Sequence, residues 1–299
     1  HSPRRQPPAG RPLAIVDFKS GAIQSVGRKG EGPGEYPNAG LIRPLGADSS
    51  IMIETLSRRW LILDGDKIVR TLTPDETALP FQAIVVGVDT LGRVGLTLPP
   101  VDANRSPEAM YVDSGRVVRW SRRTGVTTLV GYTAPATRPI DPKARTAWSS
   151  YDKAFHSKDG WTAIVRASPY RVDWFDPKGK PIAGKPIPYS PTRVDEAEKR
   201  AYMRYRAGDR KPEEPDAIGI WPKEVPPFNI AYPLLETASG ELLVPRTPTA
   251  GMPNLSYDVV DRSGRLRKSV EMPPRTYLIA FGKGVAYSVA RDEDDLVYL

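Results

Sequence analysis

The sequence contains no cysteine and only two histidines among its 299 residues. A disulfide, a thiolate metal site and a thiol nucleophile are therefore excluded. The two histidines, His1 and His156, are too few for a multi-histidine metal centre, and no Gly-x-Ser-x-Gly elbow accompanies His156 to complete a serine triad. From these absences we expect a protein that is not an enzyme and that uses no cofactor.

Long apolar runs are also missing, because no stretch reaches the roughly 18 residues of a membrane-spanning helix. The chain starts at His1-Ser2-Pro3, without Met and without an apolar leader region. We interpret this start as a processed or trimmed end that lay beyond a signal or anchor. The expectation is a periplasmic or otherwise extracytoplasmic protein, associated with a membrane but not spanning it.

Proline and glycine, by contrast, are abundant, with 32 and 25 residues. Proline removes a backbone donor and glycine weakens the interior of a helix, so long helices are disfavoured. Apolar residues still make up 39% of the chain, which is enough for a packed core. Many short strands joined by tight turns fit this composition best.

A recurring unit supports that interpretation: an apolar strand ends in Asp, a turn containing Gly follows, and a second strand leaves. Asp can bond its own turn and Gly adopts positive φ at no steric cost, so each copy predicts a hairpin. A fifth copy, at 118–125, lacks the Asp. The four complete copies lie at Asp17 with Gly21, Asp64 with Gly65, Asp176 with Gly179, and Asp261 with Gly264.

A further hairpin precedes most of these copies, so each unit is predicted to hold four antiparallel strands. The units fall at about 41–72, 81–131, 151–188 and 231–271. Residues 13–26 hold only a second hairpin, whereas 276–299 hold a first hairpin and another strand. We therefore predict a β-propeller ring closed by the N- and C-terminal strands, with five blades by count. Trp60, Trp120, Trp161 and Trp174 are expected to pack between blades.

The predicted organisation is an N-terminal extension at 1–12 and a single propeller domain at 13–299, with insertions at about 132–150 and 189–229. The second insertion contains the one predicted helix, from Val194 to Arg206. Thr192 is the expected cap, acidic residues occupy the first turn and arginines the last. Docking of this helix on the propeller's own rim and contact with a partner both remain open.

The most distinctive segment is Gly30-Glu31-Gly32-Pro33-Gly34-Glu35-Tyr36. With the repeated turns, it resembles the Gly-Glu-Gly-Pro-Gly-Glu-aromatic motif of a bacterial six-bladed β-propeller family related to NHL and TolB-like propellers. The glycines permit a crossing between blades, and we expect Glu35 to accept backbone N–H bonds that hold it. The resemblance implies six blades instead of the five counted, and it allows a place in a photosynthetic complex.

The formal net charge is +8, carried by arginine doublets more than by one block. This charge favours acidic proteins, an anionic membrane surface or nucleic acid. Aromatic residues do not interleave with the doublets as in RNA-binding modules, so nucleic acid is not expected. Trp and Arg dominate protein-binding hot spots. The predicted partner-binding residues are Arg58, Arg59, Arg122, Arg123, Trp148, Arg204, Arg206 and Trp221.

These observations predict a non-catalytic scaffold that binds other protein subunits, as an accessory extramembrane subunit of a membrane-bound complex. The alternative is a small-ligand binder, or a calcium-dependent hydrolase of the lactonase type, that uses the central channel. Propeller hydrolases of that type hold calcium with Glu, Asn and Asp side chains. The candidate ligands for it are Glu35, Asn38, Asn104, Asn229 and Asn254.

Overall fold

The computed structural model describes residues 13–17, 19–32, 34–38, 40–45, 49–54, 59–73, 83–98, 114–134, 147–148, 151–207, 211–229, 231–282, 284–292 and 296–299. The N-terminal extension at 1–12, most of the first insertion, and the individual residues Pro33, Arg58 and Asn104 lie outside them. The predictions made for those positions stay predictions.

The chain divides into two compact units, and each is treated separately below. The first comprises His1–Leu98, Val118–Leu129 and Lys158–Gly160, and the second comprises Pro99–Val117, Val130–Ser157 and Trp161–Leu299.

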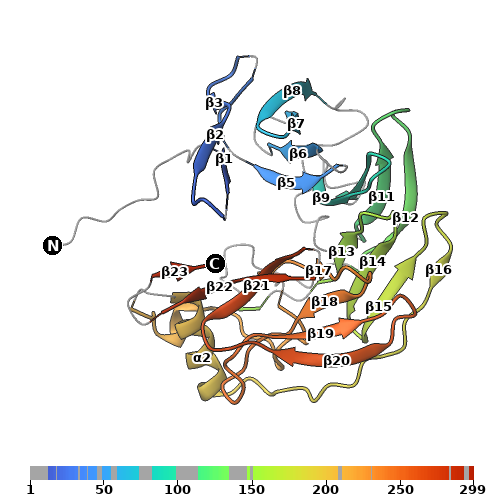
Figure 1. Cartoon of the computed structure of the whole chain (residues 1–299). Helices are drawn as coiled ribbons and strands as arrows, with labels where there is room; N and C mark the ends of the chain where they lie inside the picture. Colours follow the sequence, from blue (N-terminus) through green and yellow to red (C-terminus); the bar gives the residue numbers. More distant parts are fainter. Residues whose placement is uncertain are drawn as a thin grey trace. The chain divides into compact units, whose positions relative to one another are not determined.

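The first unit is made of short antiparallel strands in chain order (Figure 1). A two-stranded hairpin comes first, made of β1 (Leu13–Val16) and β2 (Ile23–Val26). A short parallel pair follows, β3 (Arg28–Lys29) and β4 (Glu35–Tyr36). The next sheet is a four-stranded meander of β5 (Leu41–Pro44), β6 (Ser49–Ile53), β7 (Trp60–Asp64) and β8 (Lys67–Leu72). Another meander, mostly in this unit, contains β9 (Ile84–Val88), β10 (Arg93–Leu98), β11 (Arg116–Ser121) and β12 (Thr127–Tyr132).

The second unit repeats the same arrangement. One meander holds β13 (Lys153–His156), β14 (Thr162–Ala167), β15 (Tyr170–Phe175) and β16 (Pro181–Ile182). The next holds β17 (Leu235–Glu236), β18 (Leu242–Pro245), β19 (Ser256–Val260) and β20 (Leu266–Glu271). A three-stranded sheet ends the chain, with β21 (Thr276–Phe281), β22 (Ala286–Arg291) and β23 (Val297–Tyr298). The predicted unit boundaries agree with these sheets to within a few residues.

The Asp-and-Gly turns form as predicted, because the Asp side chain accepts backbone N–H bonds across its own turn. Asp261 Oδ1 accepts from the N–H groups of Ser263 and Arg265 at 2.9 and 3.1 Å. Asp176 Oδ1 does the same for Lys178 and Lys180, both at 2.8 Å. Gly264 has a φ of +74°, which a residue with a Cβ adopts only at a cost.

Successive sheets bury their faces against one another within each unit. In the first unit, Ile51 and Ile62 of one meander share a core with Leu96 and Val118 of the next. In the second, Val165 and Trp174 of β14 and β15 share a core with Leu242 and Val260 of β18 and β19. A further core joins Leu243, Tyr257 and Val259 to Leu278 of β21. The predicted tryptophan packing between blades is confirmed for Trp60 and Trp120, which form an edge-to-face pair at 5.2 Å between ring centroids. Trp161 and Trp174 form such a pair at 6.1 Å within one blade, and Trp174 lies in the core shared with the next blade.

Four-stranded antiparallel meanders that pack face to face in chain order are the blades of a β-propeller. The described residues contain four four-stranded sheets and one three-stranded sheet, which gives the blade count of five that the repeats predicted. The terminal hairpin β1–β2 forms a sheet of its own. The ring closure by terminal strands stays a prediction.

The described part of the chain has one α-helix, α2 (Glu196–Ala207), and a short 3-10 turn, η2 (Pro215–Ala217). The helix starts later than predicted because Asp195, and not Thr192, caps it: Asp195 Oδ1 accepts the N–H of Glu198 at 3.0 Å. The carbonyl of Thr192 instead accepts a bond from Val225. Acidic side chains lie in the first turn and Arg204 and Arg206 in the last, as predicted.

Candidate partner-binding site

The Gly30–Tyr36 segment is a structural loop held by its own polar groups. Glu35 Oε2 accepts the N–H of Gly32 at 2.8 Å, which confirms the predicted role of Glu35. Glu35 Oε1 also accepts from Arg28 Nε at 2.5 Å. These bonds lower the pKa of the Glu35 carboxyl, and the bond from the Gly32 N–H has the largest effect. The hydroxyl of Tyr36 donates to the carbonyl of Val26 at 2.9 Å and fixes the far end of the loop.

Arg59, which directly precedes β7, donates to this loop. Its Nη1 donates to the carbonyl of Glu31 at 3.0 Å, and its Nη2 to the carbonyl of Glu35 at 2.5 Å. A guanidinium engaged by two backbone carbonyls holds the loop. Arg59 thus has a structural role, and its contact with a partner stays a prediction.

Arg122 and Arg123 lie in the turn between β11 and β12, where Arg123 is exposed and Arg122 is half-buried. Burial lowers the pKa of Arg122, and the nearby charges of Arg70 and Arg123 lower it further. A Cβ added at Gly92 would lie 3.3 Å from Arg122 Nη2, so this side chain covers the β9–β10 turn. Arg70, Arg122 and Arg123 form a basic surface in the first unit.

The remaining predicted residues gather in the second unit, around helix α2. Trp148 comes from the first insertion, and Trp221 from the second. Their rings lie 5.8 Å apart, and Tyr202 of α2 contacts both, at 4.7 Å from Trp148 and 5.5 Å from Trp221. The two insertions, separate in sequence, therefore share one aromatic cluster.

A small apolar core supports this aromatic cluster. Ala147, Met203 and Ile218 are buried together, and the N–H of Ala147 donates to the carbonyl of Ile220 at 3.0 Å. Trp148 has a φ of +40°, in the left-handed region that a bulky residue avoids. Such a conformation costs on the order of 1–3 kcal/mol, so the surrounding contacts hold the indole in position.

Helix α2 is tied to the blade beside it by a buried carboxylate. Glu198 is only 5% exposed, and both of its oxygens lie 3.0 Å from the N–H of Ala250, in the loop between β18 and β19. The buried residues of the helix are Glu198 and Met203, while Ala197 and Tyr205 are exposed. The helix docks on its own propeller through this bond and the aromatic cluster.

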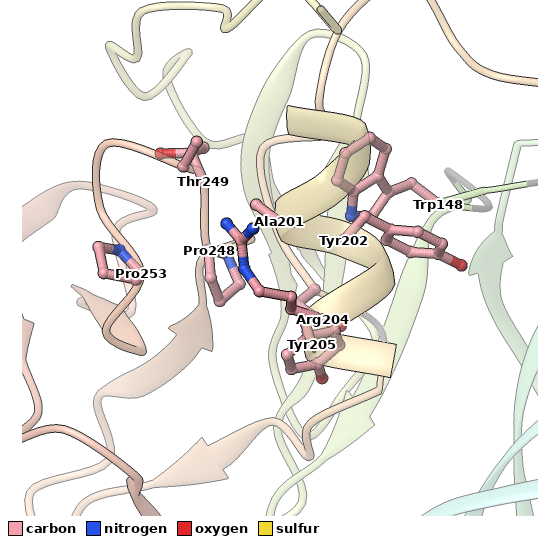
Figure 2. A pocket seen from close by; sticks show the side chains of 10 residues that line it. Trp148, Ala201, Tyr202, Arg204, Tyr205, Pro248, Thr249 and Pro253 are labelled. Atoms are coloured by element: carbon pink, nitrogen blue, oxygen red, sulfur yellow. Dashed lines mark hydrogen bonds between the residues drawn. The ribbon is translucent and has the colours of Figure 1, made fainter. Parts of the chain in front are cut away.

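Between α2 and this loop lies a cavity of about 220 Å³ (Figure 2). Figure 2 shows Trp148 and Tyr202 together on one side of the helix ribbon, with Pro248, Thr249 and Pro253 on the other. The side chain of Arg204 extends from the helix toward the proline side. The lining residues are Trp148, Ala201, Tyr202, Arg204, Tyr205, Asn229, Pro248, Thr249, Ala250 and Pro253.

The polar groups at the base of the cavity are fixed by internal bonds. Asn229 Nδ2 donates to the hydroxyl of Tyr205 at 3.3 Å, and Asn229 Oδ1 accepts the N–H of Ala231 at 2.9 Å. Tyr205 also contacts the ring of Tyr232 at 6.2 Å between centroids. Burial raises the pKa of Tyr232. The Nζ of Lys153 donates to the carbonyl of Tyr232, and burial lowers the pKa of Lys153 to about 8.

Arg204 and Arg206 are exposed on the last turn of α2. Within the part of the chain that the structure describes, Arg204 makes no hydrogen bond or ion pair, while it does line the cavity. Sequence analysis named Trp148, Trp221, Arg204 and Arg206 here but missed Tyr202, Tyr205 and the Pro248–Pro253 loop. The i, i+3 spacing of Tyr202 and Tyr205 on the helix was the sequence pattern that could have indicated these two residues.

Among the described residues, no group of three or more His, Asp or Glu side chains is placed to hold a metal ion. Glu35 is engaged in its loop, and the N–H of Asn38 donates to Glu54 at 2.8 Å. Asn229 lines the cavity, and Asn254 donates to Glu271 at 2.9 Å. Likewise, none of the helices seen in these ranges is long and apolar enough to cross a membrane.

Comparison with known proteins gives likeness of fold alone. No family model and no curated protein matches the chain. A member of the DUF4221 family from Bacteroides vulgatus is similar over 92% of this chain and 79% of its own, with 9% identity and a TM-score of 0.51. A putative exported protein from Bacteroides fragilis matches 89% of this chain and 66% of its own, with 12% identity and a TM-score of 0.46. Virginiamycin B lyase from Staphylococcus aureus matches 87% of this chain and 61% of its own, with 10% identity and a TM-score of 0.34.

Proposed function

We propose that this chain is a non-catalytic propeller scaffold that binds another protein through the helix insertion, as an accessory extramembrane subunit of a membrane-bound complex. The observation that carries this proposal is the aromatic cavity. Two segments outside the blade repeat converge there, and they bring Trp148, Tyr202 and Trp221 into contact beside an exposed Arg204. Trp, Tyr and Arg are the residues enriched at protein-binding hot spots.

The contrast with the blades supports an interface at this place. Blade residues such as Trp174 and Tyr257 are fully buried in the sheet cores, so they have no surface that a partner could contact. Trp148 and Trp221 are only partly buried, although both are large and apolar. Partly exposed aromatic side chains beside an arginine retain surface that a partner can cover.

The proposed location is the extracytoplasmic side of a membrane, where a net charge of +8 favours acidic subunits and anionic lipid headgroups. The resemblance to NHL and TolB-like propellers supports the further proposal that β1–β2 belongs to a sixth blade. A photosynthetic complex is one partner that the same resemblance allows.

The test is recovery of a partner from native membranes solubilised in mild detergent, with tagged full-length chain as bait. The variant is Arg204→Glu with Arg206→Glu. The matched control is Lys178→Glu with Lys180→Glu, which makes the same change in charge at two exposed positions of the β15–β16 turn.

We expect wild type and control to recover the same stoichiometric partner and the helix variant to lose about tenfold. Equal recovery by both variants would exclude the helix insertion as the docking element. Loss with both variants would show that only overall charge matters.

A further inference from the structure

The size of the cavity limits what can enter it. Its volume of about 220 Å³ lies below the roughly 300–1,000 Å³ of sites that enclose a drug-sized molecule. A side chain presented by a larger molecule fits this space better than a whole metabolite does. The cavity is therefore suited to an anchoring side chain.

The walls of the cavity favour an apolar or aromatic group. Trp148, Tyr202, Pro248 and Pro253 are among the residues that line it, and Figure 2 shows the two aromatic side chains on one side of the helix ribbon and the prolines on the other. Aromatic rings gain from offset or edge-to-face contacts beyond the area that they bury. The two polar side chains at its base, Asn229 and Tyr205, are bonded to one another.

The charge of the cavity selects an anion. Arg204 is the one charged residue among those that line it, and no Asp or Glu does so. Glu196 pairs with Lys199 at 2.6 Å, and the buried Glu198 carboxylate accepts the N–H of Ala250 at the cavity wall. The Arg204 guanidinium pairs with neither carboxylate, and its planar geometry matches a carboxylate.

We propose that this cavity binds an acidic peptide segment of the partner protein, with one apolar or aromatic side chain inserted beside Trp148 and Tyr202 and an adjacent carboxylate bound by Arg204. This inference rests on the proposed function, because it specifies what the partner presents to the same site. A lipid surface is disfavoured, since the cavity has a single cationic group and proline walls.

The test uses fluorescein-labelled peptides and fluorescence anisotropy with the full chain. The acidic probes are GSEWEEGS and its variants with Tyr, Phe or Leu in place of Trp. The controls are GSEAEEGS, which lacks the anchor, and GSKWKKGS, which reverses the charge. Vesicles of phosphatidylcholine with phosphatidylserine test the membrane alternative.

At least one acidic probe should bind about tenfold tighter than both controls. Arg204→Ala should remove the preference over GSKWKKGS, Arg204→Lys should retain part of it, and Lys178→Ala should leave it unchanged. Equal binding of GSEAEEGS would show charge attraction without an anchor and overturn the inference. The inference would also be overturned if the protein bound vesicles in an Arg204-dependent way but bound none of the peptides.

The outcome is separable from that of the membrane experiment. If no probe binds while the Arg204 and Arg206 variant still loses its membrane partner, the peptide inference is wrong and the scaffold function stands. If a probe binds and the membrane partner is unaffected by the variant, the cavity binds acidic peptides but is not the docking element.

Discussion

Arg59 and Arg204 show how two regions outside the regular blades use the same side chain in opposite ways. Arg59 donates to the carbonyls of Glu31 and Glu35 and closes the Gly30–Tyr36 loop. Arg204 has no such partner in the described structure and extends along a cavity. The loop satisfies its polar groups internally, whereas the insertion leaves a charge and aromatic surface available. Only the second arrangement offers another molecule something to bind.

The comparison predicts that changes in the loop lower stability without affecting a partner. The largest effect is expected for Gly27→Ala. Gly27 has a φ of +62°, and an added Cβ would lie 2.8 Å from Ile68 Cδ1 and 2.9 Å from the Gly34 carbonyl oxygen. Left-handed strain and these clashes together should lower the free energy of unfolding by about 3 kcal/mol.

Urea denaturation of Gly27→Ala measures this loss. Gly21→Ala is the control, because Gly21 has a similar φ of +70° but nothing within 4 Å of an added Cβ. It should lose only about 1 kcal/mol. Equal losses would mean that the loop is not tightly packed and would remove one side of the comparison.

Arg59→Met should lower the free energy of unfolding by about 2 kcal/mol, because the two bonds from the guanidinium to the carbonyls of Glu31 and Glu35 are lost while the apolar stem is kept. Urea denaturation and partner recovery are measured on the same sample. Arg123→Met, at an exposed turn position, is the control and should change stability little. Reduced partner recovery with a normally folded Arg59 variant would contradict the structural role.

Glu198→Ala tests the tie between α2 and its blade. The N–H of Ala250 would lose its acceptor, which should cost about 1 kcal/mol and let the cavity wall move. Thermal denaturation should show this loss, and peptide binding should weaken with it. Glu198→Gln keeps an acceptor oxygen and should preserve both. Full binding by the Ala variant would show that the tie does not shape the cavity.

A pH titration of stability tests the contribution of the Glu35 carboxyl to the loop. The pKa of Glu35 is lowered in the folded state, first by the Gly32 N–H and then by Arg28, from an ordinary value of 4.5. Its contribution to stability is therefore present above that value and is lost as pH falls through the lowered one. Denaturation midpoints should drop less between neutral and acidic pH in Glu35→Gln than in wild type. An unchanged slope would contradict the loop bonds.

The smallest effect on stability is expected for Arg204→Ala, within about 0.5 kcal/mol, because the side chain is exposed and makes no bond in the described structure. Partner recovery should nevertheless fall, which makes this variant the reverse of Arg59→Met. Denaturation and recovery measured together would settle the contrast. A stability loss comparable to that of Arg59→Met would show that Arg204 is also structural.

The turns and blade limits could be predicted because they depend on neighbours in sequence. Asp261 and Gly264 make their hairpin alone, since the carboxylate reaches N–H groups two and four residues away. Glu35 bonds Gly32 for the same local reason. The helix was predicted two residues early because Thr192 and Asp195 are both good caps, and only the bond of Thr192 to Val225 removes one of them.

The repeating strands and their turns could be predicted from local sequence, because periodicity and turn chemistry act over a few residues. Only the folded contacts show that Arg59 donates to the Gly30–Tyr36 loop and that Trp148 contacts Trp221. Contacts such as Glu198 with Ala250 join residues 52 positions apart, and no local pattern encodes such a distance. The candidate site lies where two such segments converge.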